Sequence, residues 1–341
     1  MKYKILFIGY DYNEEGVGVF LNNLDKNIKK DYNTYFFVTK KNTNKENVFD
    51  LNSLRIKEIL LLIDKAEIVH LSAHNSKHVF VALIAKLRGK YIISNYHNYF
   101  YDNSNIVKKS VMFFKKIFLL NLMNLISDYQ IFLTCSQLDN FNKYFIFNKK
   151  DKKVIPNFID NSSIIHKNKA DIKKILFIGR FNKQKGFYDL LSLSRILLLK
   201  IDAIGGKHNK INKYISFLGN IPHKEINSYY DNHEVLILPS YLEVFPMTIL
   251  EAMARGLVIL VSDIPGMREI VKEGRNGYLF PPGDVEKMKE LILYLKNNPK
   301  EIERISKNNL KDIHKFTAEK QVPKYIKVYK ELLKDDTKNK S

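Results

Sequence analysis

The fold of this chain is decided by the segment Pro239–Pro282, which reads PSYLEVFPMTILEAMARGLVILVSDIPGMREIVKEGRNGYLFPP. The run Leu257–Ser262 is almost entirely apolar, which is typical of a parallel strand buried on both faces. Before it, Pro246–Arg255 predicts a helix, because a proline in the first helical turn loses no hydrogen bond. A further apolar run, Glu234–Pro239, precedes that helix. Strand, helix and strand in this order predict a βαβ unit.

The same alternation extends outward from this segment in both directions. In the second half, further strands are predicted at Lys174–Gly179, Ile201–Ile204, Tyr214–Leu218 and Tyr278–Phe280, and helices at Phe187–Leu199, His223–Asp231, Val285–Leu295, Ile302–Phe316 and Gln321–Leu333. In the first half, strands are predicted at Ile5–Tyr10, Thr34–Thr39, Glu67–Ser72, Tyr91–His97, Tyr129–Ser136 and Lys153–Phe158, with helices at Val17–Lys29, Asn75–Leu87 and Gln137–Phe147. Two such series predict an α/β protein of two doubly wound domains, residues 1–160 and 161–320, with the polar stretch Asp160–Asp171 as linker.

Composition narrows the class of protein. The 341 residues are 45% hydrophobic and carry a formal net charge of +20, so the chain can fold and can attract polyanions. We do not predict nucleic acid as a partner, because no helix-turn-helix, zinc-finger or RNP pattern accompanies the charge. The single cysteine, Cys135, excludes an internal disulfide, fits a reducing cytosol and is predicted to be a buried structural thiol.

The first residues and the apolar runs of the chain indicate whether the protein is secreted or spans a membrane. A strand is predicted to start within the first residues, with no secretory signal before it. No apolar run approaches the roughly 20 residues that a membrane-spanning helix needs; the closest, Val111–Ile126, contains two lysines. We therefore expect a cytoplasmic protein.

Two glutamates in the deciding segment are candidates for ligand binding. Glu243 lies in the predicted strand-to-helix loop, and Glu251 lies about one and a half turns into the helix. A carboxylate at the second position can accept two hydrogen bonds from a ribose diol. Glutamates near a helix start are also common for structural reasons, since they complement the helix dipole.

A second candidate loop follows the strand Lys174–Gly179. There, Gly179–Gly186 reads GRFNKQKG. Gly179 allows a tight turn and leaves room for a ligand, while Arg180 and Lys185 can hold a diphosphate, the first as a fork and the second as a point charge. An exposed basic loop in a basic protein is the alternative interpretation.

Taken together, these residues resemble the C-terminal domain of glycosyltransferase family 4. The resemblance rests on Gly179–Gly186, on Pro239–Gly256 and on Glu273, Asn276–Gly277, Leu279 and Pro282, preceded by Val154–Asp160. It covers about residues 150–335 and implies the GT-B fold, in which two Rossmann-like domains face each other across a cleft. The first domain would bind the acceptor, the second the nucleotide-sugar, and a C-terminal helix at about 321–335 would pack back on the first.

The resemblance also implies a role for each matching residue. Arg180 and Lys185 would bind the donor diphosphate, and Glu251 the ribose. Glu243 would face the donor sugar, with the backbone N–H groups of Val244 and Phe245 near sugar or phosphate. Asn276 and Gly277 would shape a turn. The chain departs from the family at Pro246, where many members have a glycine, and at Pro265–Gly266, where a pair of glycines is usual.

The first domain matches the family more weakly. Gly16 and Gly18 follow the first strand and resemble the family's glycine loop, which approaches the diphosphate. His97 ends the strand Tyr91–His97, at the position of the family's active-site histidine, although a structural histidine would fit equally well. His70 and His74 lack an acidic third ligand in register and do not predict a metal site.

The implied reaction is retaining transfer of a hexose or N-acetylhexosamine, with front-face attack assisted by the departing phosphate. The catalytic residues would be His97, Arg180, Lys185 and Glu243. No metal or other cofactor is expected, because no D-x-D pattern ends a strand and the two cations can stabilise the leaving group. The donor is expected to be a UDP-sugar, with GDP-sugars as the alternative, and the acceptor a glycan or lipid-linked oligosaccharide of surface polysaccharide assembly.

Ile106–Met123, which reads IVKKSVMFFKKIFLLNLM, mixes lysine pairs with large apolar residues. It predicts either a helix packed on the first domain or a peripheral contact with an anionic membrane. Three other classes of protein stay open: a GT-B nucleotide-sugar epimerase, a non-catalytic polyanion-binding protein, and a Rossmann oxidoreductase. The last is disfavoured because the first strand lacks a full G-x-G-x-x-G.

Overall fold

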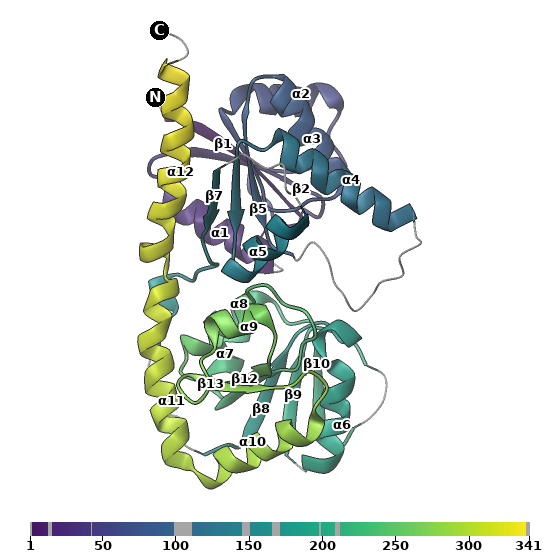
Figure 1. The fold of residues 1–341 in the computed structure, drawn as a ribbon, viewed down its shortest axis with the longest axis vertical. Helices are drawn as coiled ribbons and strands as arrows, with labels where there is room; N and C mark the ends of the chain where they lie inside the picture. Colours follow the sequence, from purple (N-terminus) through teal and green to yellow (C-terminus); the bar gives the residue numbers. More distant parts are fainter. Residues whose placement is uncertain are drawn as a thin grey trace. The chain divides into compact units, whose positions relative to one another are not determined.

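The computed structural model describes residues 2–12, 16–41, 43–98, 111–144, 151–165, 171–197, 199–208 and 212–338. The chain forms two compact units (Figure 1). The first contains Met1–Asn157 together with Ala318–Ser341, and the second contains Phe158–Thr317. Each unit is built around a parallel sheet with helices against it, as predicted for an α/β protein with two doubly wound domains.

The first unit holds a seven-stranded parallel sheet in the order β3-β2-β1-β4-β5-β6-β7. Its strands are β1 (Lys4–Gly9), β2 (Asn33–Val38), β3 (Val48–Asp50), β4 (Ile68–Leu71), β5 (Tyr91–Tyr96), β6 (Tyr129–Phe132) and β7 (Asp151–Val154). Strand β3 was not predicted, because its three residues carry no pattern of their own and are held by pairing with β2.

The helices of this unit are α1 (Gly16–Ile28), α2 (Ile56–Lys65), α3 (Ser76–Leu87), α4 (Val111–Ile126), α5 (Cys135–Tyr144) and α12 (Ala318–Lys338). Side chains of α2, α3 and α4 share one apolar core with β1 and β4. Helix α12 contacts α1 and buries Tyr325 and Tyr329 completely. Their hydroxyl groups bond to Asn95 and His70 of the sheet, at 3.2 and 2.9 Å.

The second unit holds a six-stranded parallel sheet in the order β10-β9-β8-β11-β12-β13. Its strands are β8 (Lys174–Ile178), β9 (Lys200–Ile204), β10 (Ile215–Gly219), β11 (Val235–Leu238), β12 (Val258–Ser262) and β13 (Gly277–Phe280). Its helices are α6 (Phe187–Leu197), α7 (His223–Asp231), α8 (Met247–Met253), α9 (Pro265–Ile270), α10 (Val285–Asn297) and α11 (Pro299–Asp312), with 3-10 turns at Asn161–Ser163, Lys183–Lys185 and Ile313–Phe316. Strands β8 and β11 are neighbours, which brings the loops at their carboxyl ends together.

The prediction for Cys135 was wrong. The strand Tyr129–Ser136 was expected to contain this residue, but β6 ends at Phe132 and Cys135 is the exposed first residue of α5. The reason is a helix cap: the hydroxyl of Thr134 accepts a hydrogen bond from the backbone N–H of Gln137 at 3.1 Å.

The first part of the predicted linker is bonded to the second unit. The backbone N–H of Ile165 donates to the carbonyl of Ala254 at 2.9 Å, and Nε of Arg255 donates to the carbonyl of Ser163 at 3.1 Å. In the part of the chain that the structure describes, no helix is long and apolar enough to cross a membrane.

Candidate active site

The candidate site of the second unit is built from two loops that end neighbouring strands. One loop joins β8 to α6 and contains Arg180 and Lys185; the other joins β11 to α8 and contains Glu243. The loops are tied to each other by the backbone N–H of Tyr241, which donates to the carbonyl of Gln184 at 2.8 Å. The parallel pairing of β8 with β11 thus brings residues 58 positions apart in the sequence to one place.

Gly186 fixes the distance between these loops. It has φ of 67°, in the left-handed region that glycine adopts without strain, and it ends the 3-10 turn Lys183–Lys185. A Cβ at this position would overlap the carbonyl oxygen of Pro239. On the other side of the turn, the side chain of Asn182 accepts from the backbone N–H of Lys185 at 3.0 Å. The loop that carries Lys185 is therefore fixed at both ends.

Lys185 and Glu243 form an ion pair between the two loops. The same carboxylate oxygen of Glu243 accepts from the hydroxyl of Ser240 at 3.2 Å. Arg180 lies directly after β8 with an exposed side chain. The backbone beside it is held by Gly179, whose N–H donates to the carbonyl of Ile204 at 2.8 Å. One exposed and one half-buried cation therefore border this loop pair.

Val244 and Phe245 are buried where the second loop approaches α8. Gly266, in the first turn of α9, lies against the backbone here: a Cβ on it would overlap the carbonyl oxygens of Glu243 and Val244. The ring of Phe245 packs edge-on against Phe316, with 5.3 Å between centroids. In Pro265–Gly266, where the family usually has two glycines, this chain therefore retains the glycine that the close approach requires.

Glu251, in α8, is held by two side chains of α7 that were not predicted as site residues. His223 Nε2 lies 2.8 Å from Oε1 of the carboxylate, and the hydroxyl of Tyr230 donates to Oε2 at 2.7 Å. Burial, followed by the charge of Glu251, raises the pKa of Tyr230 well above its ordinary value. The sequence predicted the helix His223–Asp231, but only the packing of α7 on α8 reveals these contacts.

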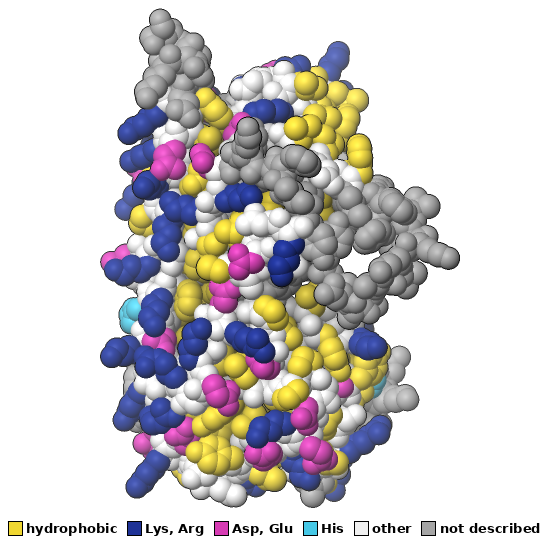
Figure 2. All heavy atoms as spheres, viewed as in Figure 1, with side chains coloured by type: hydrophobic (Ala, Val, Ile, Leu, Met, Phe, Trp, Pro, Cys, Tyr) yellow, Lys and Arg dark blue, Asp and Glu magenta, His cyan; other side chains and the backbone are white. Residues whose placement is uncertain are grey.

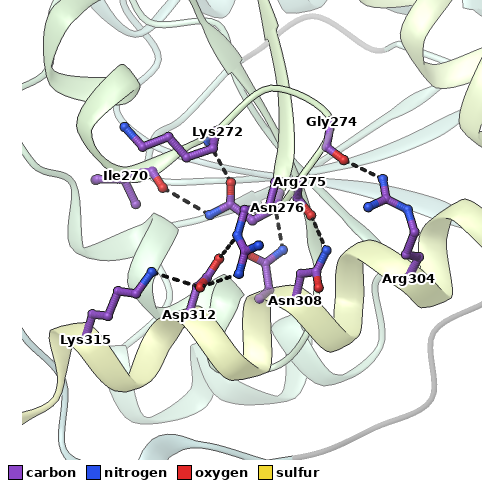
Figure 3. A network of polar contacts seen from close by, with 10 residues as sticks. Ile270, Lys272, Gly274, Arg275, Asn276, Arg304, Asn308, Asp312 and Lys315 are labelled. Carbon is purple, nitrogen blue, oxygen red and sulfur yellow. Dashed lines mark hydrogen bonds and ion pairs between the residues drawn. The ribbon is translucent and has the colours of Figure 1, made fainter.

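The segment around Asn276 forms a turn anchored on α11 (Figure 3). The buried side chain of Asn276 accepts from the backbone N–H of Lys272 at 2.7 Å and donates to the carbonyl of Ile270 at 3.0 Å. The guanidinium of Arg275 donates twice to Asp312, at 2.8 and 3.0 Å. These hydrogen bonds, the largest cause, hold the pKa of the Asp312 carboxyl below its ordinary value. Asn276 thus stabilises the turn that leads into β13, at the amino end of that strand, whereas the candidate loops follow the carboxyl ends of β8 and β11.

The remaining predicted site residues lie in the first unit. Gly16 and Gly18 are in the first turn of α1, while Glu15 before them lies outside the described residues. His97 follows β5, with its ring 4.9 Å from that of Phe20. Burial lowers the pKa of His97 to about 3, so its imidazole is neutral at physiological pH.

Two further histidines lie near His97: His70 is in β4, and His74 follows that strand. Burial also lowers the pKa values of His70 and His74 to about 3. Nε2 of each of these three histidines makes no hydrogen bond to any described residue. Within the described ranges, no group of three or more His, Cys, Asp or Glu side chains is arranged to hold a metal ion.

Comparison with known proteins finds a family match for the second unit. Residues 158–312, which make up nearly all of the second unit, match the family described as glycosyl transferases group 1. An uncharacterized glycosyltransferase of Methanocaldococcus jannaschii is 32% identical over 182 residues, covering 50% of this chain and 52% of that protein. The N,N'-diacetylbacillosaminyl-diphospho-undecaprenol alpha-1,3-N-acetylgalactosaminyltransferase of Campylobacter jejuni is 26% identical over 197 residues, covering 54% and 52%.

The solved structures extend the likeness to both units. The crystal structure of Anabaena HepE in complex with UDP-glucose has a TM-score of 0.80 at 15% identity, covering 96% of this chain and 99% of that one. This likeness confirms the predicted GT-B fold. In sequence, the chain spans about half the length of the curated relatives it matches. The second unit is thus similar in sequence to proteins named as glycosyltransferases, and the solved structures show the fold of both units.

Proposed function

We propose that this chain is a retaining, metal-independent glycosyltransferase of family 4. In this proposal it moves a hexose or N-acetylhexosamine from a nucleotide-sugar, preferably a UDP-sugar, to a glycan or lipid-linked acceptor in surface polysaccharide assembly. The observation that carries the proposal is the pair of loops after β8 and β11, which joins Lys185 to Glu243 at the carboxyl ends of neighbouring strands and carries Arg180 on the first loop. Ligands of open α/β sheets bind at such ends.

The donor is proposed to bind in the second unit. Arg180 and Lys185 hold its diphosphate, and binding exchanges part of the Lys185–Glu243 interaction for contacts with phosphate oxygens. Glu251 accepts from the ribose hydroxyls. Glu243 and the backbone N–H groups of Val244 and Phe245 face the sugar or the phosphate. The first unit contributes Gly16 and Gly18 near the diphosphate and His97 as a neutral imidazole.

The transfer step conserves the configuration of the sugar. The bond between the anomeric carbon and the β-phosphate oxygen breaks, and its electron pair stays on the phosphate. The acceptor hydroxyl bonds to the same face of that carbon and gives its proton to the departing phosphate. Arg180 and Lys185 stabilise the negative charge that develops there, which is the largest catalytic effect available to such a site.

The relatives support the choice of donor and acceptor. The HepE structure was solved with UDP-glucose, and the Campylobacter enzyme is named for an undecaprenol-diphosphate-linked substrate. We propose a UDP-sugar and a lipid-linked glycan for this chain on that basis.

A peripheral membrane contact on the first unit is part of the proposal. Of the segment Ile106–Met123, residues 106–110 and the side chains of 111–117 lie outside the description. The neighbouring surface supports the contact: Phe118 and Leu125 of α4 are 67% and 73% exposed, and Phe80 and Leu87 of α3 are 61% and 80% exposed. Figure 2 shows hydrophobic side chains gathered over the α2–α3 part of this unit. Co-sedimentation with anionic vesicles, weakened by salt, is the expected result; equal sedimentation with neutral vesicles contradicts it.

Two measurements test the proposed reaction. A thermal-shift series with UDP, GDP and their sugars identifies the donor, because a ligand that binds the native state raises Tm. Free nucleotide is then measured with and without an acceptor lipid fraction. Release only in the presence of acceptor supports a transferase, whereas release without acceptor, with conversion of the sugar, indicates an epimerase. Absence of any shift or release contradicts the proposal.

A further inference from the structure

Two side chains on one face of α7 hydrogen-bond to the carboxylate of Glu251. His223 and Tyr230 are seven residues apart, which places them two turns apart on the same side of that helix. Each bonds to a different oxygen of the carboxylate, at 2.8 and 2.7 Å. The carboxylate therefore has a fixed orientation, because rotating it would break both bonds.

The two partners differ in exposure. Tyr230 is 1% exposed, and because burial and the charge of Glu251 keep its hydroxyl protonated, it acts only as a donor to this carboxylate. The side chains of Glu251 and His223 are 13% and 29% exposed. Tyr230 thus holds the carboxylate from the buried side, whereas the side chains of Glu251 and His223 are partly open to solvent.

We propose that Tyr230 and His223 are positioning residues that orient Glu251 toward the ribose hydroxyls of the donor and so set the preference for a ribonucleotide over a 2′-deoxyribonucleotide. This inference rests on the proposed function, in which Glu251 binds the ribose. A carboxylate accepts two hydrogen bonds from a vicinal diol best in a narrow range of orientations, so a group held before the ligand arrives loses less freedom on binding. Tyr230 fixes the carboxylate plane, and His223 fixes the oxygen nearer to solvent.

The preference for UDP over 2′-deoxy-UDP is the readout, because general loss of stability leaves this ratio unchanged. Dissociation constants for both nucleotides are measured by calorimetry on the full chain; where GDP binds in place of UDP, the pair is GDP and 2′-deoxy-GDP. Tyr230→Phe removes only the hydroxyl and keeps the buried ring. Tyr229→Phe removes a hydroxyl from the same helix and is the matched control.

The wild type is expected to prefer the ribonucleotide by about tenfold or more, the value of a hydrogen bond to a charged group. Tyr230→Phe should lower this preference about threefold or more, while Tyr229→Phe keeps it. His223→Gln retains a donor near the position of Nε2 and should stay close to wild type. His223→Asn, which is too short to reach, should lose preference as Tyr230→Phe does.

The outcomes separate this inference from the function on which it rests. If Glu251→Ala abolishes the preference but Tyr230→Phe and His223→Asn keep it, the positioning role is wrong and the ribose assignment stands. If Glu251→Ala also keeps the preference, then ribose binding by Glu251 fails, and the positioning role fails with it.

Discussion

Lys185 and Glu243 form an ion pair that joins the loop after β8 to the loop after β11, with Ser240 donating to the same carboxylate oxygen. The pair is mostly buried, and each charge has the other as a close partner. Before any donor binds, the carboxylate of Glu243 balances the positive charge of Lys185, and the ion pair holds the two loops next to each other. We expect the donor to bind the same lysine. Substitution of Lys185 or Glu243 should therefore change the stability of the second unit as well as donor binding.

Lys185 and Glu243 should be energetically coupled. Lys185→Met leaves a carboxylate without its cation, which should lower the free energy of unfolding by about 2–4 kcal/mol. Glu243→Gln keeps an acceptor for Ser240 and should cost less. In the double variant, the loss should be smaller than the sum of the two by about 1–2 kcal/mol. Urea denaturation of the four proteins measures this, and additive losses would show that the pair is not coupled.

Gly186 should be intolerant of any side chain. Gly186→Ala adds a Cβ against the carbonyl oxygen of Pro239 and also strains a backbone with φ of 67°. We expect a loss of about 3 kcal/mol or more, or a chain that does not fold. Gly89 has φ of 73° but nothing within 4 Å of its Cβ position, so Gly89→Ala isolates the backbone strain and should cost about 1–2 kcal/mol. Equal losses in denaturation curves would contradict the contact with Pro239.

Asn276 should affect stability without affecting donor affinity. Asn276→Ala leaves the N–H of Lys272 and the buried carbonyl of Ile270 without their side-chain partner, an expected loss of about 2–4 kcal/mol. Asn308→Ala removes a single exposed bond to the carbonyl of Arg275 and should cost less than about 1 kcal/mol. The donor KM of the folded fraction should equal that of the wild type in both. A raised donor KM for Asn276→Ala alone would assign the turn to the site itself.

Three histidines of the first unit predict a loss of stability in acid. Burial lowers the pKa values of His70, His74 and His97 to about 3, against about 6.5 when unfolded. Between these values the unfolded chain binds more protons, so stability is fully present above pH 6.5 and falls as pH decreases, by about 1.4 kcal/mol per pH unit for each histidine. His74→Phe keeps the ring stacked on Tyr96 and should make the slope shallower by that amount. Urea midpoints from pH 7.5 to 5 provide the test, and an unchanged slope would contradict it.

Most of the strands could be predicted from the sequence because buried parallel strands are apolar throughout and differ in pattern from amphipathic helices. The placement of Glu243 in a loop and of Glu251 in a helix followed from one proline and one apolar run. Strand β3 was missed because it depends on its neighbour β2, and Cys135 was misplaced because a threonine cap ended β6 early. Elements stabilised by partners distant in sequence leave no local pattern.

The same limit applies within the candidate site. Arg180, Lys185 and Glu251 could be selected because their residue types suit a diphosphate and a ribose at strand and helix ends. The partners His223 and Tyr230 could not, since a histidine and a tyrosine in an amphipathic helix have many ordinary roles. Only the packing of α7 against α8 places both on the carboxylate of Glu251. Similarly, the need for Gly186 arises from the carbonyl of Pro239 in another loop.

The central claim is that Arg180 and Lys185 stabilise a departing nucleoside diphosphate. It is tested most directly by the acceptor-dependent kcat of Arg180→Ala and Lys185→Ala, with Lys183→Ala, an exposed lysine of the same loop, as the control for charge. We expect kcat to fall by about 100-fold or more in the first two, as when an oxyanion donor is removed, and to stay near wild type in Lys183→Ala. Near-wild-type turnover in Arg180→Ala and Lys185→Ala would contradict the account.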